Sequence, residues 1–284
     1  MSRIAYVNGQ YVPASEAMVN VEDRGYQFAD GIYEVCVLVN GRYWDIDGHL
    51  ARLDRSLSEL RMASPMDHGA LKVVMREVVR RNRLKDALVY LQVTRGVAPR
   101  NHIFPPEGTP PSLVITARRL NFDLGEARAA NGVAVITYPD IRWGRVDIKT
   151  IGLLPNVLAK QAASEAGAYE AMLVRDGHVT ECSSSNAWIV DETGALITHP
   201  KGDSILGGIT RQTAMACAED LQIRVIERPF TVAEAMAASE VFLTSATSFV
   251  MPVAAIDGVK IGSGRPGPVT QRLREAYKQK AARG

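Results

Sequence analysis

Short alternating apolar segments occur in pairs, and the dipeptides that join them limit the fold more than any other feature. The joining dipeptides are Asn8-Gly9, Asn40-Gly41 and Asp176-Gly177. Asn-Gly and Asp-Gly accept the left-handed backbone angles that a two-residue β-hairpin turn requires. The sequence therefore predicts hairpins within residues 1–15, 31–45 and 168–181.

Helical periodicity separates these hairpins. Leucines recur at helical spacing over residues 48–62, and a second apolar stripe covers 69–82, so each stretch predicts an amphipathic helix. Further helices are predicted over 154–167, 207–221, 231–239 and 267–281, a further hairpin over 186–200, and strand segments over 87–96, 112–120, 132–139, 223–230 and 240–257. Hairpins with helices gathered on one side favour an α+β fold over a parallel array of β-α-β units.

The polar stretch of residues 121–132 interrupts the periodic pattern, so we place the domain boundary there. A length of 284 residues suits two domains. We therefore expect an N-terminal domain over 1–120, an interdomain linker over 121–132 and a C-terminal domain over 133–284. The G-x-G-x-x-G pattern at 262–267 contains a proline and has too little chain after it for a dinucleotide-binding unit, so we expect a loop before the last helix.

The composition excludes several classes of protein. A net charge of +2 gives no basic footprint for nucleic acid, and no apolar run approaches the roughly 20 residues that span a bilayer. The alternating N-terminal stretch lacks the apolar core of a signal peptide, so we expect a cytoplasmic location. The three cysteines show no C-x-x-C spacing and the histidines no H-E-x-x-H motif, so we expect neither a disulfide framework nor a metal site.

Lys149, in the stretch DIKT, precedes the apolar run IGLLP and is the first candidate catalytic residue. Apolar surroundings favour the neutral amine of a lysine, and a neutral amine can form a Schiff base with an aldehyde. A solvated surface lysine is the alternative that this residue alone leaves open.

Two segments have the features of a phosphate site. In GGIT, residues 207–210, two glycines precede a predicted helix whose free N–H groups and dipole attract phosphate, and the Thr210 hydroxyl adds a donor. In TSATS, residues 244–248, small and hydroxyl residues follow a predicted strand. Arg52 lies off the apolar face of its predicted helix and can supply a counter-charge. A helix cap, a simple turn and a solvated arginine are the respective alternatives.

Glu181, at the start of the hydroxyl-rich stretch ECSSSN, is the last candidate. A single carboxylate there can hold a protonated ring nitrogen, and a solvated loop is the alternative. A lysine, a phosphate site, an arginine and a carboxylate together are what pyridoxal phosphate requires, because its aldehyde takes the lysine and its pyridinium nitrogen takes the acid.

In this order the candidates closely resemble the fold-type IV pyridoxal-phosphate enzymes, the class IV aminotransferase family. The resemblance is carried by DIKTIGLLPNVLAKQAASEAGAYEAMLVRDGHVTECSSSNAWIV and ILGGITRQTAMACAE, and it extends from residue 7 to the last predicted helix. It implies pyridoxal 5'-phosphate as the cofactor, a smaller N-terminal α/β domain, and a larger C-terminal domain with a barrel-like sheet that carries the cofactor lysine.

Two further stretches, GIYEV (31–35) and TRGVAPRNHIFP (94–105), are similar to the D-amino acid transaminases of this family. In those enzymes a tyrosine and an Arg-x-His pair capture the substrate α-carboxylate, and the matching residues are Tyr33, Arg100 and His102. Phenol, guanidinium and imidazole suit this task because all three donate hydrogen bonds to a carboxylate. The resemblance also implies that Arg100 and His102 reach in from a partner subunit, and hence a homodimer with its active site shared across the interface.

The resemblance assigns the remaining roles. Lys149 carries the cofactor and moves the substrate proton, and Glu181 keeps the pyridine nitrogen protonated. The residues expected at the phosphate or the ring are Arg52, Leu206, Ile209, Thr210, Ser245 and Ala246. Ala246 and Phe249 depart from the family, which often has a threonine and an acidic residue there, so they bring a phosphate contact and the range of substrates into question.

The expected reaction is transamination between a D-amino acid such as D-alanine and a 2-oxo acid such as 2-oxoglutarate or pyruvate. Aminodeoxychorismate lyase, a branched-chain L-aminotransferase and an (R)-amine transaminase stay open as alternatives within the family. A pyridoxal-phosphate-binding protein without turnover is the non-enzyme alternative, and the intact Lys149 and Glu181 argue against it.

Overall fold

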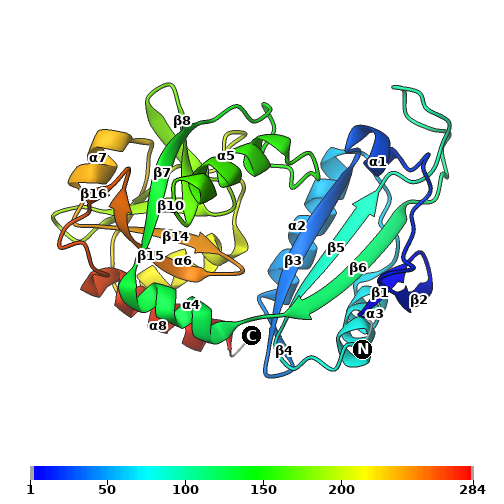
Figure 1. The fold of residues 1–284 in the computed structure, drawn as a ribbon, viewed down its shortest axis with the longest axis horizontal. Helices are drawn as coiled ribbons and strands as arrows, with labels where there is room; N and C mark the ends of the chain where they lie inside the picture. Colours follow the sequence, from blue (N-terminus) through cyan, green and yellow to red (C-terminus); the bar gives the residue numbers. More distant parts are fainter. Residues whose placement is uncertain (1–2, 283–284) are drawn as a thin grey trace. The chain divides into compact units, whose positions relative to one another are not determined.

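A computed structural model describes residues 3–282 of the chain (Figure 1). The chain forms two compact units. The first comprises the residues up to Leu120 together with Ile148–Gly152, and the second comprises Asn121–Asp147 together with the residues from Leu153 on. Each unit has its own hydrophobic core.

The first unit is built on a six-stranded antiparallel sheet. Its spatial order is β2-β1-β6-β5-β3-β4, with β1 at Ile4–Val7, β2 at Gln10–Pro13, β3 at Gly31–Val39, β4 at Arg42–Trp44, β5 at Ala87–Thr94 and β6 at Ser112–Arg119. The hairpins predicted at Asn8-Gly9 and Asn40-Gly41 are confirmed, and all four turn residues have positive φ angles.

Two helices cover this sheet. Helix α2 (Ile46–Glu59) packs on β3, and α3 (His68–Arg81) packs on β1, β5 and β6 (Figure 1). The leucine stripe predicted for α2 is buried in the core with side chains of the sheet. A short helix, α1 (Arg24–Phe28), was not predicted, because five residues are too few to show a helical period.

The second unit contains a ten-stranded mixed sheet that curls into a half-barrel. Its order is β12-β11-β10-β14-β15-β7-β8-β9-β13, and β16 pairs with β15. The strands are β7 (Val133–Pro139), β8 (Glu170–Arg175), β9 (His178–Cys182), β10 (Asn186–Val190), β11 (Leu196–Thr198), β12 (Val225–Glu227), β13 (Phe230–Thr231), β14 (Glu240–Ser245), β15 (Phe249–Ile256) and β16 (Val259–Lys260). The hairpin predicted at Asp176-Gly177 joins β8 to β9 and is confirmed.

The helices of the second unit pack on different parts of this sheet. Helix α5 (Leu154–Glu165) packs on β7 and β8, whereas α6 (Ile209–Asp220) and α8 (Pro268–Ala281) pack on β14 and β15. Helix α4 (Phe122–Asn131) contacts β15, and α7 (Val232–Ala237) contacts β13. The predicted helices and the α+β class are therefore confirmed.

The structure differs from the prediction made from the sequence at the expected domain boundary. We predict a linker over 121–132, but the structure has α4 there, with Asn121 as its cap and Ala129 in the core of the second unit. Ala129 is the one buried residue of α4, so the segment shows no apolar stripe that a sequence pattern would reveal. The Lys149 segment, expected with the C-terminal domain, groups with the first unit because its backbone pairs with β3.

Two strand predictions also differ from the structure. The predicted strand 223–230 is split into β12 and β13, because Pro229 has no N–H group to donate to a ladder. Strand β7 runs parallel to β8, with α5 between them, and this β-α-β unit is not predicted by the hairpin pattern. Among residues 3–282, the helices are all too short or too polar to cross a membrane.

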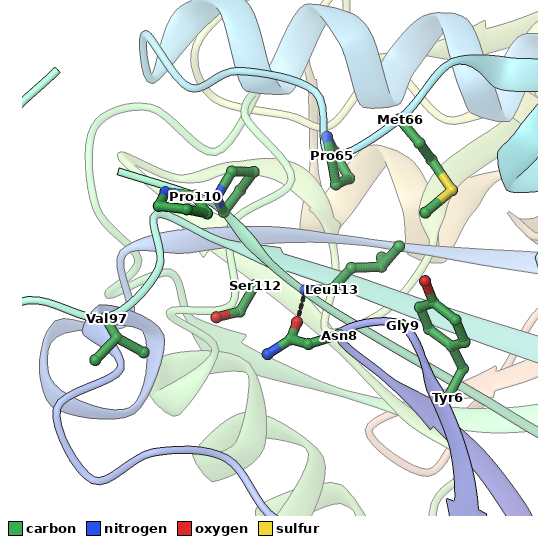
Figure 2. Close-up of a pocket in the computed structure, with 10 residues that line it drawn as sticks. Tyr6, Asn8, Gly9, Pro65, Met66, Val97, Pro110, Ser112 and Leu113 are labelled. Atoms are coloured by element: carbon green, nitrogen blue, oxygen red, sulfur yellow. Dashed lines mark hydrogen bonds between the residues drawn. The ribbon is translucent and has the colours of Figure 1, made fainter. Parts of the chain in front are cut away.

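A surface pocket of about 450 Å³ opens in the first unit, where β1 ends and β6 begins (Figure 2). Tyr6, Val97 and Pro110 are among the residues that line it, and Asn8 Oδ1 accepts a hydrogen bond from Leu113 N–H at 2.7 Å. The residues that line this pocket include none of the candidate site residues.

Candidate active site

The segment that carries Lys149 is fixed on two sides within the first unit. On one side, Tyr33 N–H of β3 donates to the Lys149 carbonyl at 3.0 Å, and Ile151 N–H donates to the Gly31 carbonyl at 3.0 Å. On the other side, Lys149 N–H donates to Ser56 Oγ of α2 at 3.4 Å. The Lys149 side chain is half-buried, and its Nζ lies 4.1 Å from the centroid of the Tyr33 ring. The candidate lysine is therefore held against β3, beside the tyrosine predicted to bind substrate.

Tyr33 belongs to a small group of aromatic and polar side chains on β3 and β5. Its ring stacks on Tyr90 with centroids 5.6 Å apart, and Tyr90 Oη donates to Gln92 Oε1 at 2.7 Å. Burial, with a smaller effect of Tyr33, raises the pKa of Tyr90 to about 12. The phenol of Tyr90 is therefore neutral at pH 7, and this side of the strand offers hydrogen-bond donors rather than negative charge.

Arg52 was expected off the apolar face of its helix, but it lies on the face of α2 that packs on β3, where Glu34 holds its guanidinium. Arg52 Nε and Nη2 donate to Glu34 Oε1 and Oε2 at 2.7 and 2.8 Å. His49, three residues earlier on α2, donates from Nδ1 to Glu34 Oε2 at 2.8 Å. The Arg52 side chain is only 10% exposed, so the alternative of a solvated arginine is wrong.

Arg100 and His102 lie on an exposed loop of the first unit. Both pack around Phe28 of α1, with Arg100 Cζ 4.5 Å from the centroid of the Phe28 ring and the His102 ring 5.5 Å from it. In the single chain these two side chains lie at the surface, and their role toward a substrate stays a prediction.

Glu181 is the penultimate residue of β9 and is 5% exposed. Its Oε1 accepts a hydrogen bond from Arg142 Nη1, and its Oε2 accepts from Asn186 Nδ2 at 2.8 Å and from Leu206 N–H at 3.1 Å. Three donors satisfy a buried charge that would be unfavourable alone. A solvated loop is therefore the wrong description of this residue, and its contact with a ring nitrogen stays a prediction.

Arg142 connects Glu181 to a second buried carboxylate, that of Asp140. Arg142 Nε and Nη2 each donate to Asp140 at 2.9 Å, and Thr180 Oγ1 donates to it at 2.8 Å. Arg175 Nη2 lies 3.2 Å from Asp140 Oδ2. Burial by itself raises the pKa of Asp140, but the hydrogen bonds and charge of Arg142 outweigh it and hold the pKa at about 2. The loop after β7 thus carries a buried network of charges that ends at Glu181.

The phosphate site predicted from GGIT is the N-terminus of α6. Gly208 is the N-cap and no side chain caps the helix, so Thr210, which is 3% exposed, is not the capping residue of the alternative interpretation. A Cβ on Gly208 would lie 2.1 Å from Asn186 Oδ1, so a larger residue at this position would force the Asn186 side chain to move. Asn186 Nδ2 also donates to the Leu206 carbonyl at 2.8 Å. An uncapped helix start of this kind is suited to bind an anion.

The end of β14 lies beside the start of α6, because Thr244 pairs with Asn186 in the sheet and α6 packs on β14. The two segments predicted at the phosphate, GGIT and TSATS, therefore come from neighbouring elements. Ser245 Oγ lies 2.7 Å from Ser248 Oγ, so these two hydroxyls bond to each other. Ala246 follows without a hydroxyl and leaves only its backbone to contact an anion.

Phe249 is buried in an aromatic cluster of the second unit. It has a φ angle of +61° and is 4% exposed. Its ring lies against those of Phe122 on α4 and Tyr277 on α8, at centroid distances of 6.0 and 5.7 Å. This aromatic cluster accounts for the burial of the Phe249 ring, and its effect on the range of substrates stays a prediction.

Each unit by itself carries residues whose chemistry fits a part of pyridoxal phosphate. The first unit provides an amine beside a phenol, and a buried arginine with a fixed orientation. In the second unit, residues 206–210 run from a hydrogen bond with Glu181 to the uncapped N-terminus of α6. A buried acid and an anion site are therefore joined by one short segment, as an aromatic ring with a phosphate requires.

The sequence did not reveal three residues of this site: Glu34, Arg142 and Asn186. Glu34 left a signal, since it is a lone carboxylate within the apolar strand GIYEVCVLV. Arg142 left none, because it lies in a loop and meets Glu181 only through folding. Asn186 left no signal of its own in the sequence; in the structure it is the first residue of β10.

Residues 31–256 match the family described as amino-transferase class IV. The chain belongs to the class IV aminotransferases, and it is a pyridoxal-phosphate-dependent aminotransferase.

Particular relatives are similar over almost the whole chain. The D-alanine aminotransferase of Bacillus licheniformis is 44% identical over 269 residues, which cover 95% of this chain and 94% of the relative. The D-alanine aminotransferase of Listeria monocytogenes serotype 4b (strain F2365) is 42% identical over 272 residues, covering 95% and 93%. The crystal structure of the branched-chain aminotransferase from the archaeon Thermoproteus uzoniensis with norvaline is similar in fold, with a TM-score of 0.85 and 28% identity over 98% of this chain and 94% of that one.

Proposed function

We propose that this protein transfers the amino group of a D-amino acid, D-alanine or one like it, to a 2-oxo acid such as 2-oxoglutarate or pyruvate. The position of Lys149 carries the proposal, since its backbone is bonded to β3 and its Nζ lies 4.1 Å from the centroid of the Tyr33 ring. The relatives named D-alanine aminotransferases, at 44% and 42% identity, support the D-amino acid as substrate.

Pyridoxal 5'-phosphate supplies an aldehyde that takes up the amino group and a ring that disperses the electrons left at the substrate α-carbon. In this proposal Lys149 would hold the cofactor through its aldehyde carbon, and Glu181 would keep the ring nitrogen protonated. Leu206 would pack against the ring. The residues that would hold the phosphate are Arg52, Ile209, Thr210, Ser245 and Ala246.

The substrate α-carboxylate is bound by Tyr33 from one subunit and by Arg100 and His102 from its partner. Two observations support a homodimer of this kind. Arg100 and His102 lie on an exposed loop. The same unit exposes large apolar side chains, and apolar surface of this kind marks a protein interface where it is contiguous: Met18 (81%), Val21 (74%), Tyr26 (75%) and Ile103 (71%).

Lys149 also moves the substrate proton. With the substrate amine in its place on the cofactor, the Lys149 amine would be free to accept the α-proton and to deliver it to the carbon that carried the aldehyde. The ring of Tyr33 lies beside Nζ and limits where the amine can point. The residues of 1–120 then supply the carboxylate site and the phosphate arginine, and those of 133–284 supply the acid and the helix N-terminus.

A panel of substrates tests the proposal against its alternatives. A branched-chain L-aminotransferase is the second candidate, because a solved structure of a branched-chain aminotransferase matches with a TM-score of 0.85. We expect D-alanine with 2-oxoglutarate or pyruvate to yield 2-oxo acid much faster than L-leucine or a simple (R)-amine. Faster turnover of L-leucine, or release of pyruvate from aminodeoxychorismate without any acceptor, would overturn the proposal.

A further inference from the structure

Glu34 is a buried carboxylate that has no part in the proposed reaction. It follows Tyr33 on β3, but the alternation of the strand turns it to the opposite face, where α2 packs. It is 0% exposed. A charge in such a place is strongly unfavourable unless opposite charges and donors surround it.

Its partners are Arg52 and His49. Arg52 donates two hydrogen bonds to it in a bidentate arrangement, and His49 donates one. Burial by itself raises the pKa of Glu34, but the charge and hydrogen bonds of Arg52 and the hydrogen bond of His49 outweigh it, and the pKa falls to about 2. Glu34 is therefore ionised at neutral pH, and the planar guanidinium of Arg52 is fixed by two of its three nitrogens.

The contacts of α2 extend this arrangement to the lysine segment. His49, Arg52 and Ser56 occupy spacings i, i+3 and i+7, so they form one stripe of α2. Ser56 Oγ accepts the hydrogen bond of Lys149 N–H at 3.4 Å, while Arg52 bonds to Glu34. One stripe of a helix and one strand thus fix Arg52, Lys149 and Tyr33 together.

We propose that Glu34, supported by His49, is a positioning residue that orients Arg52 for the cofactor phosphate. A long arginine side chain loses conformational freedom when it binds an anion, and a guanidinium that is already oriented loses less. This inference rests on the proposed function, in which Arg52 binds the phosphate. The competing description is an ion pair that only joins α2 to β3.

Binding of two vitamers to the enzyme stripped of its cofactor separates these descriptions. Pyridoxal phosphate and pyridoxal have the same aldehyde and ring, but only the first has a phosphate. Glu34→Gln keeps the shape of the side chain and removes its charge. Since hydrogen bonds to charged groups contribute about 1.5–3 kcal/mol, we expect the affinity for pyridoxal phosphate to fall about 10- to 100-fold. The affinity for pyridoxal should stay unchanged.

The variant Arg52→Gln provides the reference. Arg52→Gln should lower the affinity for pyridoxal phosphate and leave the affinity for pyridoxal unchanged. The double variant of Glu34→Gln and Arg52→Gln should lose no more affinity than Arg52→Gln alone, because Glu34 acts through Arg52. The inference would be overturned if Glu34→Gln lowered the affinity for both vitamers equally. It would also be overturned if the losses of affinity of the two single variants added up fully in the double variant. If Arg52→Gln binds both vitamers as the unaltered enzyme does, the inference fails while the transaminase remains. Failure of the unaltered enzyme to bind pyridoxal phosphate would instead remove the proposed function.

Variants of His49 keep the inference testable if Glu34→Gln does not fold. His49→Ala removes one hydrogen bond and leaves the ion pair in place, and His49→Asn restores a nitrogen donor near the position of Nδ1. We expect His49→Ala to lower the affinity for pyridoxal phosphate but not for pyridoxal, and we expect His49→Asn to bind pyridoxal phosphate with the affinity of the unaltered enzyme. A variant His49→Ala that binds pyridoxal phosphate with full affinity would overturn the role of His49 and Glu34 as a positioning pair.

Discussion

Replacement of Arg142 by methionine tests the buried network that ends at Glu181. The Arg142 side chain is 5% exposed, and it joins Asp140 and Glu181, whose side chains are 0% and 7% exposed. Methionine keeps much of the volume but removes the charge, so two buried carboxylates lose their shared partner. Removal of one partner from a buried ion pair destabilises a protein by about 3–5 kcal/mol, and we expect Arg142→Met to lower the free energy of unfolding by that amount at pH 7.

The pKa of Asp140 gives a second estimate of how much the network stabilises the protein. It also predicts how that contribution to the free energy of unfolding changes with pH. Folding lowers this pKa from 3.8 to about 2, which corresponds to about 2 kcal/mol of stability at pH 7. This contribution is complete above the unfolded pKa of 3.8 and is lost as the pH falls through the folded pKa of about 2. Without Arg142 the buried carboxylates take up protons at a higher pH, so the deficit of the variant should shrink as the pH is lowered from neutrality.

Urea unfolding of the cofactor-loaded enzyme, followed by circular dichroism at neutral and mildly acidic pH, measures both effects. Lys280→Met is the matched control, because Lys280 pairs with Asp220 at 2.7 Å but is 42% exposed. A surface pair of this kind contributes less than about 1 kcal/mol. The reasoning is refuted if Arg142→Met loses no more stability than the control, or if its deficit grows as the pH falls.

Three further predictions test the site. Glu181→Ala should keep the cofactor bound but lower kcat by about 10³, because a charge pair about 4 Å apart at an effective dielectric constant of about 20 contributes about 4 kcal/mol; unchanged turnover would show that another group holds the ring nitrogen. Arg100→Ala should raise KM for amino acids more than KM for amines without a carboxylate, and equal effects would remove Arg100 from the carboxylate site. Gly208→Ala places a Cβ 2.1 Å from Asn186 Oδ1 and should weaken pyridoxal phosphate binding, whereas Gly207→Ala meets nothing within 4 Å and should not. Equal binding by the two alanine variants would place the phosphate elsewhere.

The parts of the fold that the sequence predicts are those with a local signal. The Asn-Gly and Asp-Gly turns and the leucine stripe of α2 each depend on residues close together in the chain, and the structure confirms them. Helix α4 has one buried residue, Ala129, so nothing in its pattern distinguishes it from a linker. The grouping of Lys149 with the first unit depends on hydrogen bonds to Tyr33, 116 positions away in the sequence, and no local pattern encodes them.

The candidate site divides in the same way. Lys149, Glu181 and the glycines before α6 were identifiable because their residue types and order match a known chemistry. Their supporting residues were not, because each acts through a partner distant in sequence: Arg142 is 39 positions from Glu181, and Glu34 is 18 positions from Arg52. Buried ion pairs of this kind become visible only when the burial of each side chain is known.

The most direct test is the identity of the lysine that bonds to the cofactor. Purified protein is incubated with pyridoxal phosphate, reduced with borohydride, digested and analysed by mass spectrometry. We predict a phosphopyridoxyl group on the peptide that contains Lys149, and none on the variant Lys149→Ala. A group on any other lysine, or an unaltered protein that carries none, would contradict the assignment of Lys149 and with it the proposed activity.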